Sequence, residues 1–194
     1  MLSHRIYSNR ISLAFTLLIV SLTAHSEIHG QQGIFKSAND FVSNKVEFTQ
    51  AHRIVLNDIL YRPFISLKLH DTTLQFSKDS IFGFRDAEGK CYRFFNKSIY
   101  TIVSADENII LYQRKQSGAS RGNINVLRSY FSCNAASDIC ELSHSELLRE
   151  YADQPDFVEL LYKSERNGCD LTAFDEFHHR YFIAQFFYDI KKTK

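Results

Sequence analysis

The stretch SIFGFRDAEGKCYRFFNKSIYTIVSADENIILYQ, residues 80–113, decides the fold class of this chain. It holds four short apolar runs joined by polar turns, one at residues 86–89 that ends in glycine and one at residues 104–107. Runs joined by such short turns must pair antiparallel, because a parallel crossover needs about a dozen residues or more. The stretch therefore predicts two consecutive β-hairpins.

The same period of two continues on both sides of these hairpins. Ile65, Leu67 and Leu69 alternate with polar residues before them, and residues 123–131 alternate after them. Residues 34–131 thus predict an antiparallel β-meander of six or seven short strands, which could curl into a partial barrel. Ser37 with Asp40 three residues later forms a capping-box pattern that predicts a short helical turn over 38–43.

Residues 143–190 change to a helical pattern, so the expected fold class is α+β with two or three C-terminal helices. Ser143 and Glu146 form a capping box for the first helix, and Pro155 suits the first turn of the second. A long third helix is expected to begin near residues 170–172. Its second half, residues 181–190, is apolar nearly all round, which predicts either deep burial or an oligomer interface.

The first 26 residues have the order of a cleavable signal peptide. Arg5 and Arg10 precede an uncharged apolar stretch at 11–24, and the small residues Ala24 and Ser26 precede a cleavage site after Ser26, with cleavage after Ala24 as the alternative. That stretch is shorter than the roughly 20 residues that span a bilayer, so an uncleaved anchor is the alternative. The mature chain would be one α+β domain, residues 27–194, exported to the periplasm, cell envelope or medium, with no transmembrane segment.

Charge and motifs exclude several functions. Removing residues 1–26 takes away two arginines and no acid, which leaves 21 basic residues against 22 acidic ones, a net charge of −1. This balance argues against nucleic acid as a partner, because nucleic-acid binding needs a basic face. The chain has no nucleophile elbow and no zinc-protease motif, and it predicts no cofactor.

Four cysteines in an exported chain favour disulfide bonds. Cys133 and Cys140 bracket a short polar loop and are the expected pair, which leaves Cys91 to bond with Cys169. Four reduced, buried thiols are the alternative interpretation.

The densest polar cluster lies in the expected third helix. Asp175 with His178, and Glu176 with His179, are each three residues apart and would share a helix face. Such pairs can ligate a divalent metal, although known helical sites draw them from more than one helix. A solvated helix face is the simpler interpretation.

The hairpin at residues 82–95 is a better candidate for recognition than for chemistry. It presents Arg85, Tyr92 and Arg93 on adjoining strands, and arginine and tyrosine are enriched in binding surfaces. Simple cross-strand packing is the alternative role for these side chains.

At this hairpin the chain resembles a group of uncharacterised exported bacterial proteins. The resemblance rests on KDSIFGFRDAEGKCYRFFNKSIYTIV and the preceding GIFKSANDF, and it covers about residues 34–114. It implies export and an α+β fold and brings no known activity. Phe82 departs from that pattern, where tryptophan is more usual, and so do the cysteines.

We therefore expect an exported, non-enzymatic module that binds an envelope protein or a surface glycan through the aromatic hairpin. A metal-dependent hydrolase that uses the acid–histidine cluster is one alternative. The other is an oligomeric structural protein of the envelope that associates through its C-terminal helix.

Overall fold

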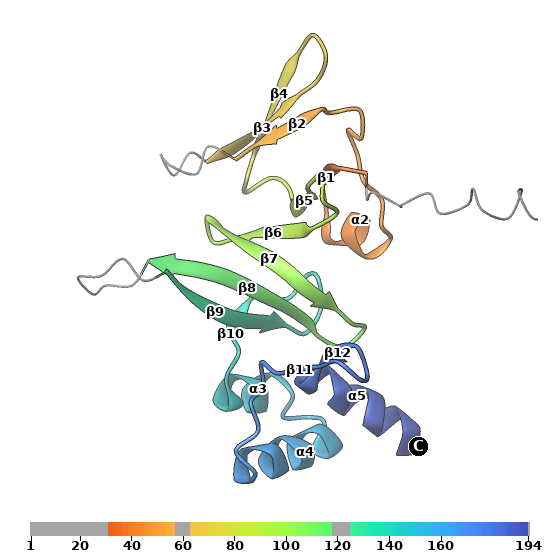
Figure 1. Cartoon of the computed structure of the whole chain (residues 1–194), viewed down its shortest axis with the longest axis vertical. Helices are drawn as coiled ribbons and strands as arrows, with labels where there is room; N and C mark the ends of the chain where they lie inside the picture. Colours follow the sequence, from red (N-terminus) through yellow and green to blue (C-terminus); the bar gives the residue numbers. More distant parts are fainter. Residues whose placement is uncertain (1–30, 57–62, 118–124, 194) are drawn as a thin grey trace, which may run out of the picture.

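The computed structural model describes residues 31–56, 63–117 and 125–193. Within these ranges the chain is α+β: a seven-stranded antiparallel sheet, a three-stranded sheet and a two-stranded hairpin, with helices mainly at the C-terminal end. Figure 1 shows the three-stranded sheet at one end, the large sheet in the middle and the helices at the other end. The expected signal peptide and residues 118–124 lie outside the described residues. No described helix is long and apolar enough to cross a bilayer.

The large sheet has the order β1 (Gly33–Phe35), β5 (Gly83–Arg85), β6 (Cys91–Phe95), β7 (Ser98–Ala105), β8 (Ile110–Ser117), β9 (Asn125–Ser132) and β10 (Cys140–Glu141). It contains five strands of the predicted meander, β5 to β9, and adds β1 and β10 at its two edges. Both hairpins expected from residues 80–113 are present as β5–β6 and β7–β8. The sheet is open in the described part of the chain, with β1 and β10 at its edges, so the partial barrel does not form.

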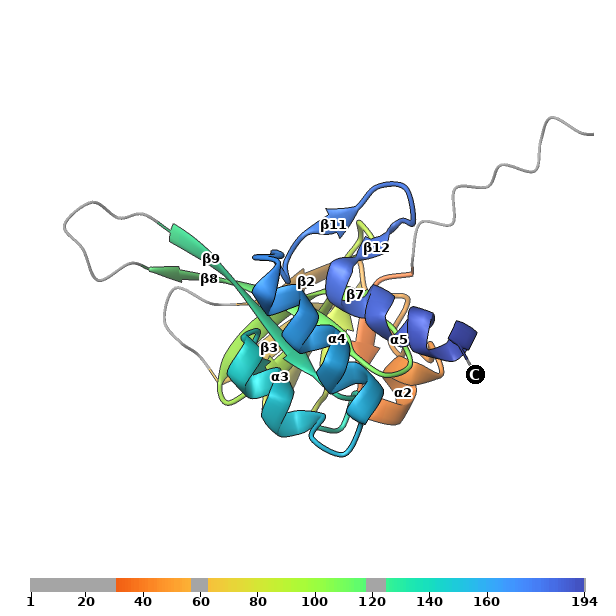
Figure 2. The ribbon, with the colours of Figure 1, turned by 90° about the horizontal axis from the view of Figure 1, so that it is seen from below.

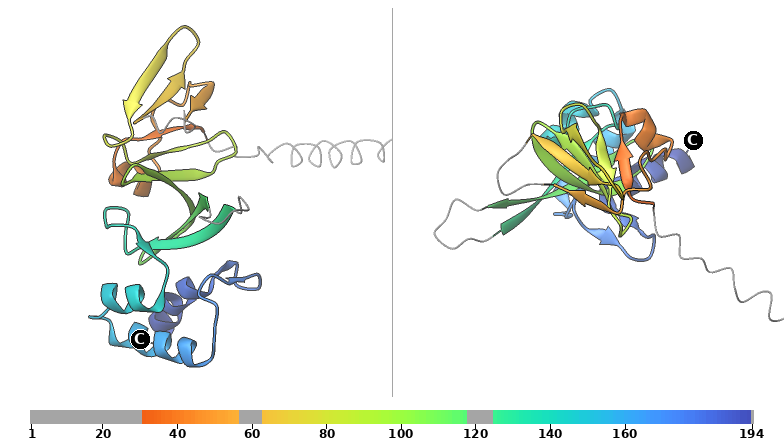
Figure 3. Two further views of the ribbon diagram at one scale, coloured as in Figure 1. Left: turned by 90° about the vertical axis from the view of Figure 1, so that its left-hand side faces the viewer. Right: turned by 90° about the horizontal axis from the view of Figure 1, so that it is seen from above.

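The strand expected at 65–69 belongs to the second sheet and not to the meander. This sheet has the order β2 (Arg53–Val55), β3 (Phe64–Lys68), β4 (Thr73–Ser77). The side chains of Ile65 and Leu67 are fully buried against Phe84 and Phe94 of the large sheet. The second sheet therefore covers one end of the large sheet, as Figure 3 shows from the side.

Four helices occur in the described residues: α2 (Ala38–Val42), α3 (His144–Glu150), α4 (Pro155–Arg166) and α5 (Phe182–Thr193). The capping box of Ser37 and Asp40 forms at α2, and the Ser143 hydroxyl accepts the Glu146 N–H at α3. Pro155 occupies the first turn of α4. Helices α3, α4 and α5 lie together beneath β8 and β9 (Figure 2).

Helix α5 starts about ten residues later than the sequence predicts, and a hairpin takes its first turns. Strands β11 (Phe174–Asp175) and β12 (Arg180–Tyr181) pair antiparallel. The Asp175 carboxylate accepts the backbone N–H groups of Phe177 and His178, at 2.8 and 3.1 Å. Aspartate in this position offers the backbone a turn in competition with a helix, which explains the wrong prediction.

The apolar second half of α5 is buried in the chain's own core. Ile183, Ala184, Phe186 and Phe187 are between 0% and 7% exposed and pack on residues of the sheet and of α4. The spare apolar face expected for an oligomer interface at residues 181–190 is therefore used inside the molecule. Tyr188 is 40% exposed, so burial within the chain covers most of this stretch and not all of it.

The two faces of the large sheet have different covers, and this separates neighbouring hairpin residues. One face is covered by the three-stranded sheet near β5 and β6 and by the C-terminal helices near β8 and β9. The other face packs under α2 and the loop before β10. Because successive side chains of a strand point to opposite faces, Tyr92 lies on the first face and Arg93 on the second.

Candidate functional site

A groove of about 350 Å³ lies between β2 and the β5–β6 hairpin. One wall carries His52, Arg53 and Ile54, and the other carries Asp86 and Tyr92. Two sequence-distant elements, one from each sheet, thus converge on one concavity. Such convergence of polar groups on a partly apolar hollow is typical of a binding site.

The apolar part of the groove is a pair of stacked rings. Phe84 and Tyr92 are direct cross-strand partners, with ring centroids 4.6 Å apart and planes within 8° of parallel. Phe84 is buried, and the half-buried Tyr92 has Thr101 as its cross-strand neighbour on the other side. The Tyr92 side chain lines the groove together with Ile54 and Leu56.

Asp86 fixes the position of the tyrosine hydroxyl. One carboxylate oxygen accepts the N–H groups of Glu88 and Lys90, both at 2.9 Å, which holds the hairpin turn. The other oxygen accepts the Tyr92 hydroxyl, also at 2.9 Å. Burial, together with this hydrogen bond to a carboxylate, raises the pKa of Tyr92 to about 12. The ring is therefore neutral at physiological pH and held in one orientation.

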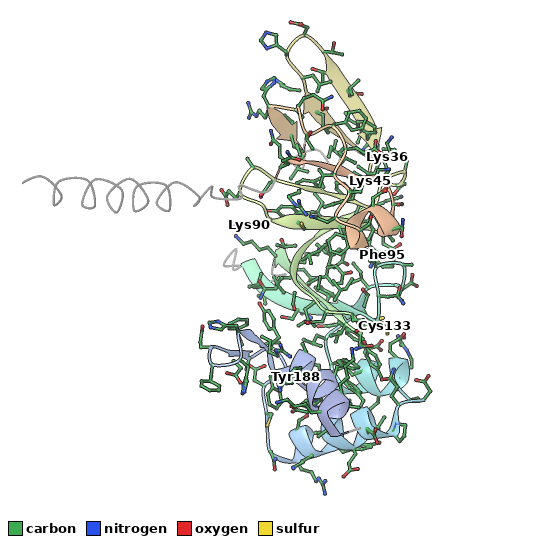
Figure 4. All side chains as sticks on the ribbon, turned by 90° about the vertical axis from the view of Figure 1, so that its right-hand side faces the viewer. Lys36, Lys45, Lys90, Phe95, Cys133 and Tyr188 are labelled. Atoms are coloured by element: carbon green, nitrogen blue, oxygen red, sulfur yellow. The ribbon has the colours of Figure 1, made fainter. Side chains whose placement is uncertain are left out.

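The β2 wall supplies polar side chains that remain available to a ligand. His52 and Arg53 are exposed, and within the described part of the chain neither side chain forms a hydrogen bond or ion pair. On the opposite wall Glu88 is exposed and its carboxylate bonds to the Lys90 ammonium at 2.7 Å. Figure 4 shows Lys90 at the outer end of the hairpin. The groove thus combines a half-buried tyrosine with exposed polar side chains and an accessible carboxylate.

Arg93 is not a surface residue, and its expected role in recognition is wrong. The residue is 5% exposed, and its guanidinium donates to the Tyr112 hydroxyl at 2.9 Å and to the Ser137 carbonyl at 2.7 Å. Its guanidinium carbon lies 5.2 Å from the ring centre of Phe82 and 5.5 Å from that of Phe95. Arg93 is thus a core residue that joins the sheet to the loop before β10.

Arg85 lies on the same face of the large sheet as Arg93 and does not reach the groove. Its guanidinium donates to the Asn44 side chain and to the Cys91 sulfur, and it stacks over Phe35 at 5.3 Å. Of the three predicted recognition residues, the structure therefore places only Tyr92 in the groove. Cross-strand packing, the alternative role, describes the two arginines.

The acid–histidine cluster forms a turn and not a helix face. His178 Nδ1 lies 2.6 Å from an Asp175 carboxylate oxygen, and this hydrogen bond lowers the pKa of Asp175. Glu176 and His179 are exposed on the same turn. Among the described residues no three metal-ligating side chains come together. The geometry therefore offers a hydrogen-bonded pair, which is less than a metal site needs.

All four cysteines are free thiols, so the expected Cys133–Cys140 and Cys91–Cys169 disulfides are absent from this structure. The Cys140 sulfur accepts a hydrogen bond from Arg149 at 3.4 Å, and the Cys133 thiol donates to Glu150 at 3.8 Å. Burial raises the pKa of both thiols. Figure 4 shows Cys133 where the large sheet meets the helices. Each of the two sulfurs contacts a charged side chain of α3.

A second hollow of about 670 Å³ follows the outer side of α4. All of its lining residues come from one continuous segment, residues 152–166, among them Tyr162. Because only this one segment lines the hollow, a ligand there would contact no second element. It is therefore a poorer candidate for a binding site than the groove between β2 and the β5–β6 hairpin.

The sequence favours a strand for part of residues 46–60, but it does not indicate that this strand forms a wall of a groove. Residues 46–60 contain no clear period, and the three-residue strand β2 is too short to produce one. His52 and Arg53 therefore read as isolated surface residues until the fold brings them opposite Tyr92.

No protein-family model, curated protein or solved structure matches the chain. The functional argument consequently rests on the chemistry of the groove.

Proposed function

We propose that this chain is an exported, non-enzymatic binding module that holds a surface glycan in the groove between β2 and the β5–β6 hairpin. The observation that carries the proposal is that the half-buried Tyr92 and the exposed side chains of His52 and Arg53 line one groove. A sugar ring has one face of C–H groups and a rim of hydroxyls. The aromatic face suits the former, and the donors and Glu88 suit the latter.

The size and rigidity of the groove also support a small, preorganised ligand site. A hollow of about 350 Å³ falls at the lower end of the range for small-molecule pockets. Asp86 and Phe84 hold the Tyr92 ring before any ligand arrives, so little conformational entropy is lost on binding. Export is supported by the order of residues 1–26 and by the resemblance of the hairpin to exported bacterial proteins.

An array of bacterial surface polysaccharides and peptidoglycan fragments, probed with the purified exported protein, tests this function. We expect binding that Tyr92→Ala weakens about tenfold or more, because an aromatic anchor commonly carries over 1 kcal/mol of binding energy. Tyr162→Ala, which removes a half-exposed tyrosine on α4, is the matched control and should bind like the wild type. If glycan binds equally to the wild type and to both variants, the groove is not the binding site. Capture of an envelope protein without any glycan would assign the groove to that other class of partner.

A further inference from the structure

Strand β4 has a free edge in the described part of the chain. It is the outer strand of the sheet β2–β3–β4, at the end of the molecule farthest from the helices (Figure 1). Its inner edge bonds to β3, and the ends of this ladder are the pairs Leu69–Thr72 and Pro63–Lys78, each joined by a 2.8 Å hydrogen bond. Antiparallel pairs alternate between bonded and non-bonded, so Leu74 and Phe76 bond to β3. The backbone groups of Thr73, Gln75 and Ser77 consequently point outward.

This edge lacks the features that normally protect a sheet edge. The strand is TLQFS, with no charge, no proline and no glycine. Thr73, Gln75 and Ser77 are exposed, whereas Leu74 and Phe76 are half-buried over the core beneath the sheet. Natural proteins place lysine, proline or a bulge at an exposed edge to prevent pairing with another chain. An edge without them fits a strand-pairing surface.

The edge is complementary to itself. If two copies of β4 pair antiparallel about a two-fold axis at Gln75, then Gln75 meets Gln75 of the second copy and Thr73 meets Ser77. These are the residues whose N–H groups point outward, so the two glutamines exchange both backbone hydrogen bonds. The Ser77 N–H reaches the Thr73 carbonyl at each end, while the Ser77 carbonyl already accepts from Ser80. On the other side of the strands, Leu74 of one copy meets Phe76 of the second.

We propose that two copies of this chain associate through β4, with Gln75 on the two-fold axis, to form a continuous six-stranded antiparallel sheet. An isologous contact of this kind closes after two copies and leaves no unpaired β4 edge for further growth. The two copies are then joined by four backbone hydrogen bonds, two between the Gln75 residues and one from each Ser77 N–H to the Thr73 carbonyl of the other copy.

The association has a consequence that rests on the proposed function. The groove lies along β2, which is the opposite edge of the three-stranded sheet, so it stays open in the dimer. A dimer would present two grooves to a repeating polymer, and the second binding event would become intramolecular.

Sedimentation equilibrium of the purified exported protein tests the dimer without reference to any ligand. The range from about 1 μM to about 1 mM covers the weak affinity typical of a small interface. We expect a concentration-dependent dimer for the wild type. Gln75→Lys and Gln75→Glu should each be monomeric, because like charges directly opposite across a strand pair are destabilising. An equimolar mixture of these two variants should dimerise again, because the two-fold axis sets lysine against glutamate.

Gln154→Lys, at the exposed start of α4, adds the same charge far from β4 and should dimerise like the wild type. Circular dichroism checks that each variant is folded, and Gln75→Glu is an independent test if the lysine variant is not. A wild type that stays monomeric at the highest concentration would overturn the proposal. So would single charged variants that dimerise normally, or a mixture that stays monomeric. Loss of glycan binding with the dimer intact would count against the groove alone.

Discussion

Arg93 is a buried structural cation, and its removal should cost stability before it affects any ligand. Arg93 is 5% exposed, and its guanidinium donates to the Tyr112 hydroxyl and the Ser137 carbonyl. In Arg93→Met the apolar stem is kept, while the Ser137 carbonyl loses its donor and the contacts with the Phe82 and Phe95 rings lose their charge. An unpaired buried acceptor costs about 1–3 kcal/mol and a cation–π contact about 0.5–2 kcal/mol. The Tyr112 and Ser132 hydroxyls still bond to each other at 2.8 Å, and loss of a buried charge offsets part of the cost.

We therefore expect Arg93→Met to lower the free energy of unfolding by about 2 kcal/mol. Arg93→Ala also removes the packed stem and should lower it by roughly 3–5 kcal/mol. Arg85→Ala is the matched control on the neighbouring strand. That residue is partly exposed and bonds mainly to the Asn44 side chain, so its loss should cost about 1 kcal/mol. Urea unfolding followed by far-UV circular dichroism measures all three. The reasoning is refuted if Arg93→Ala is as stable as Arg85→Ala but has lost ligand binding.

Four further outcomes follow from the packing of α5, the hairpin turn and the N-terminus. Phe187→Ala should lower the free energy of unfolding by about 3–5 kcal/mol, because Phe187 stacks on Phe157 with ring centroids 4.7 Å apart. Its exposed neighbour Tyr188 should tolerate alanine. Equal losses of stability in urea unfolding would show that α5 is not packed as described. The neutral form of Tyr92 is favoured in the folded state, so its contribution to stability is complete below pH 10, the ordinary pKa, and is lost as the pH rises towards about 12. Asp86→Asn should bring the Tyr92 pKa back towards 10.0 in a ¹³C NMR titration, and an unchanged value would disprove the role of the carboxylate. Mass spectrometry of the exported product should find Glu27 as the first residue, and a chain that keeps Met1 would contradict cleavage.

The sequence predicts the elements of this fold better than their assembly. Both hairpins of residues 80–113 follow from short turns, and the helix starts at Ser37, Ser143 and Pro155 follow from capping chemistry. These features depend on residues close together in the chain. The placement of β3 in a second sheet cannot be predicted in this way, because a half-buried strand alternates apolar and polar residues in either sheet.

The candidate site shows the same division between local and distant information. Tyr92 and Arg93 are adjacent and equally plausible as surface residues, and alternation alone places them on opposite faces of the sheet. Which face is open depends on the distant loop that supplies Ser137 and on the β2 wall that supplies Arg53. The predicted start of α5 is wrong for a local reason. Asp175 stabilises a turn within a segment whose apolar spacing resembles that of a helix.

The most direct test of the central claim is a ¹⁵N NMR titration of the protein with a saccharide selected from the array. If the groove holds the sugar, the backbone amides of residues 52–56 and 84–92 should shift together and saturate with one affinity. Shifts confined to α4, or spread over the β8–β9 ribbon with no change at Tyr92, would contradict the claim that this groove is the binding site.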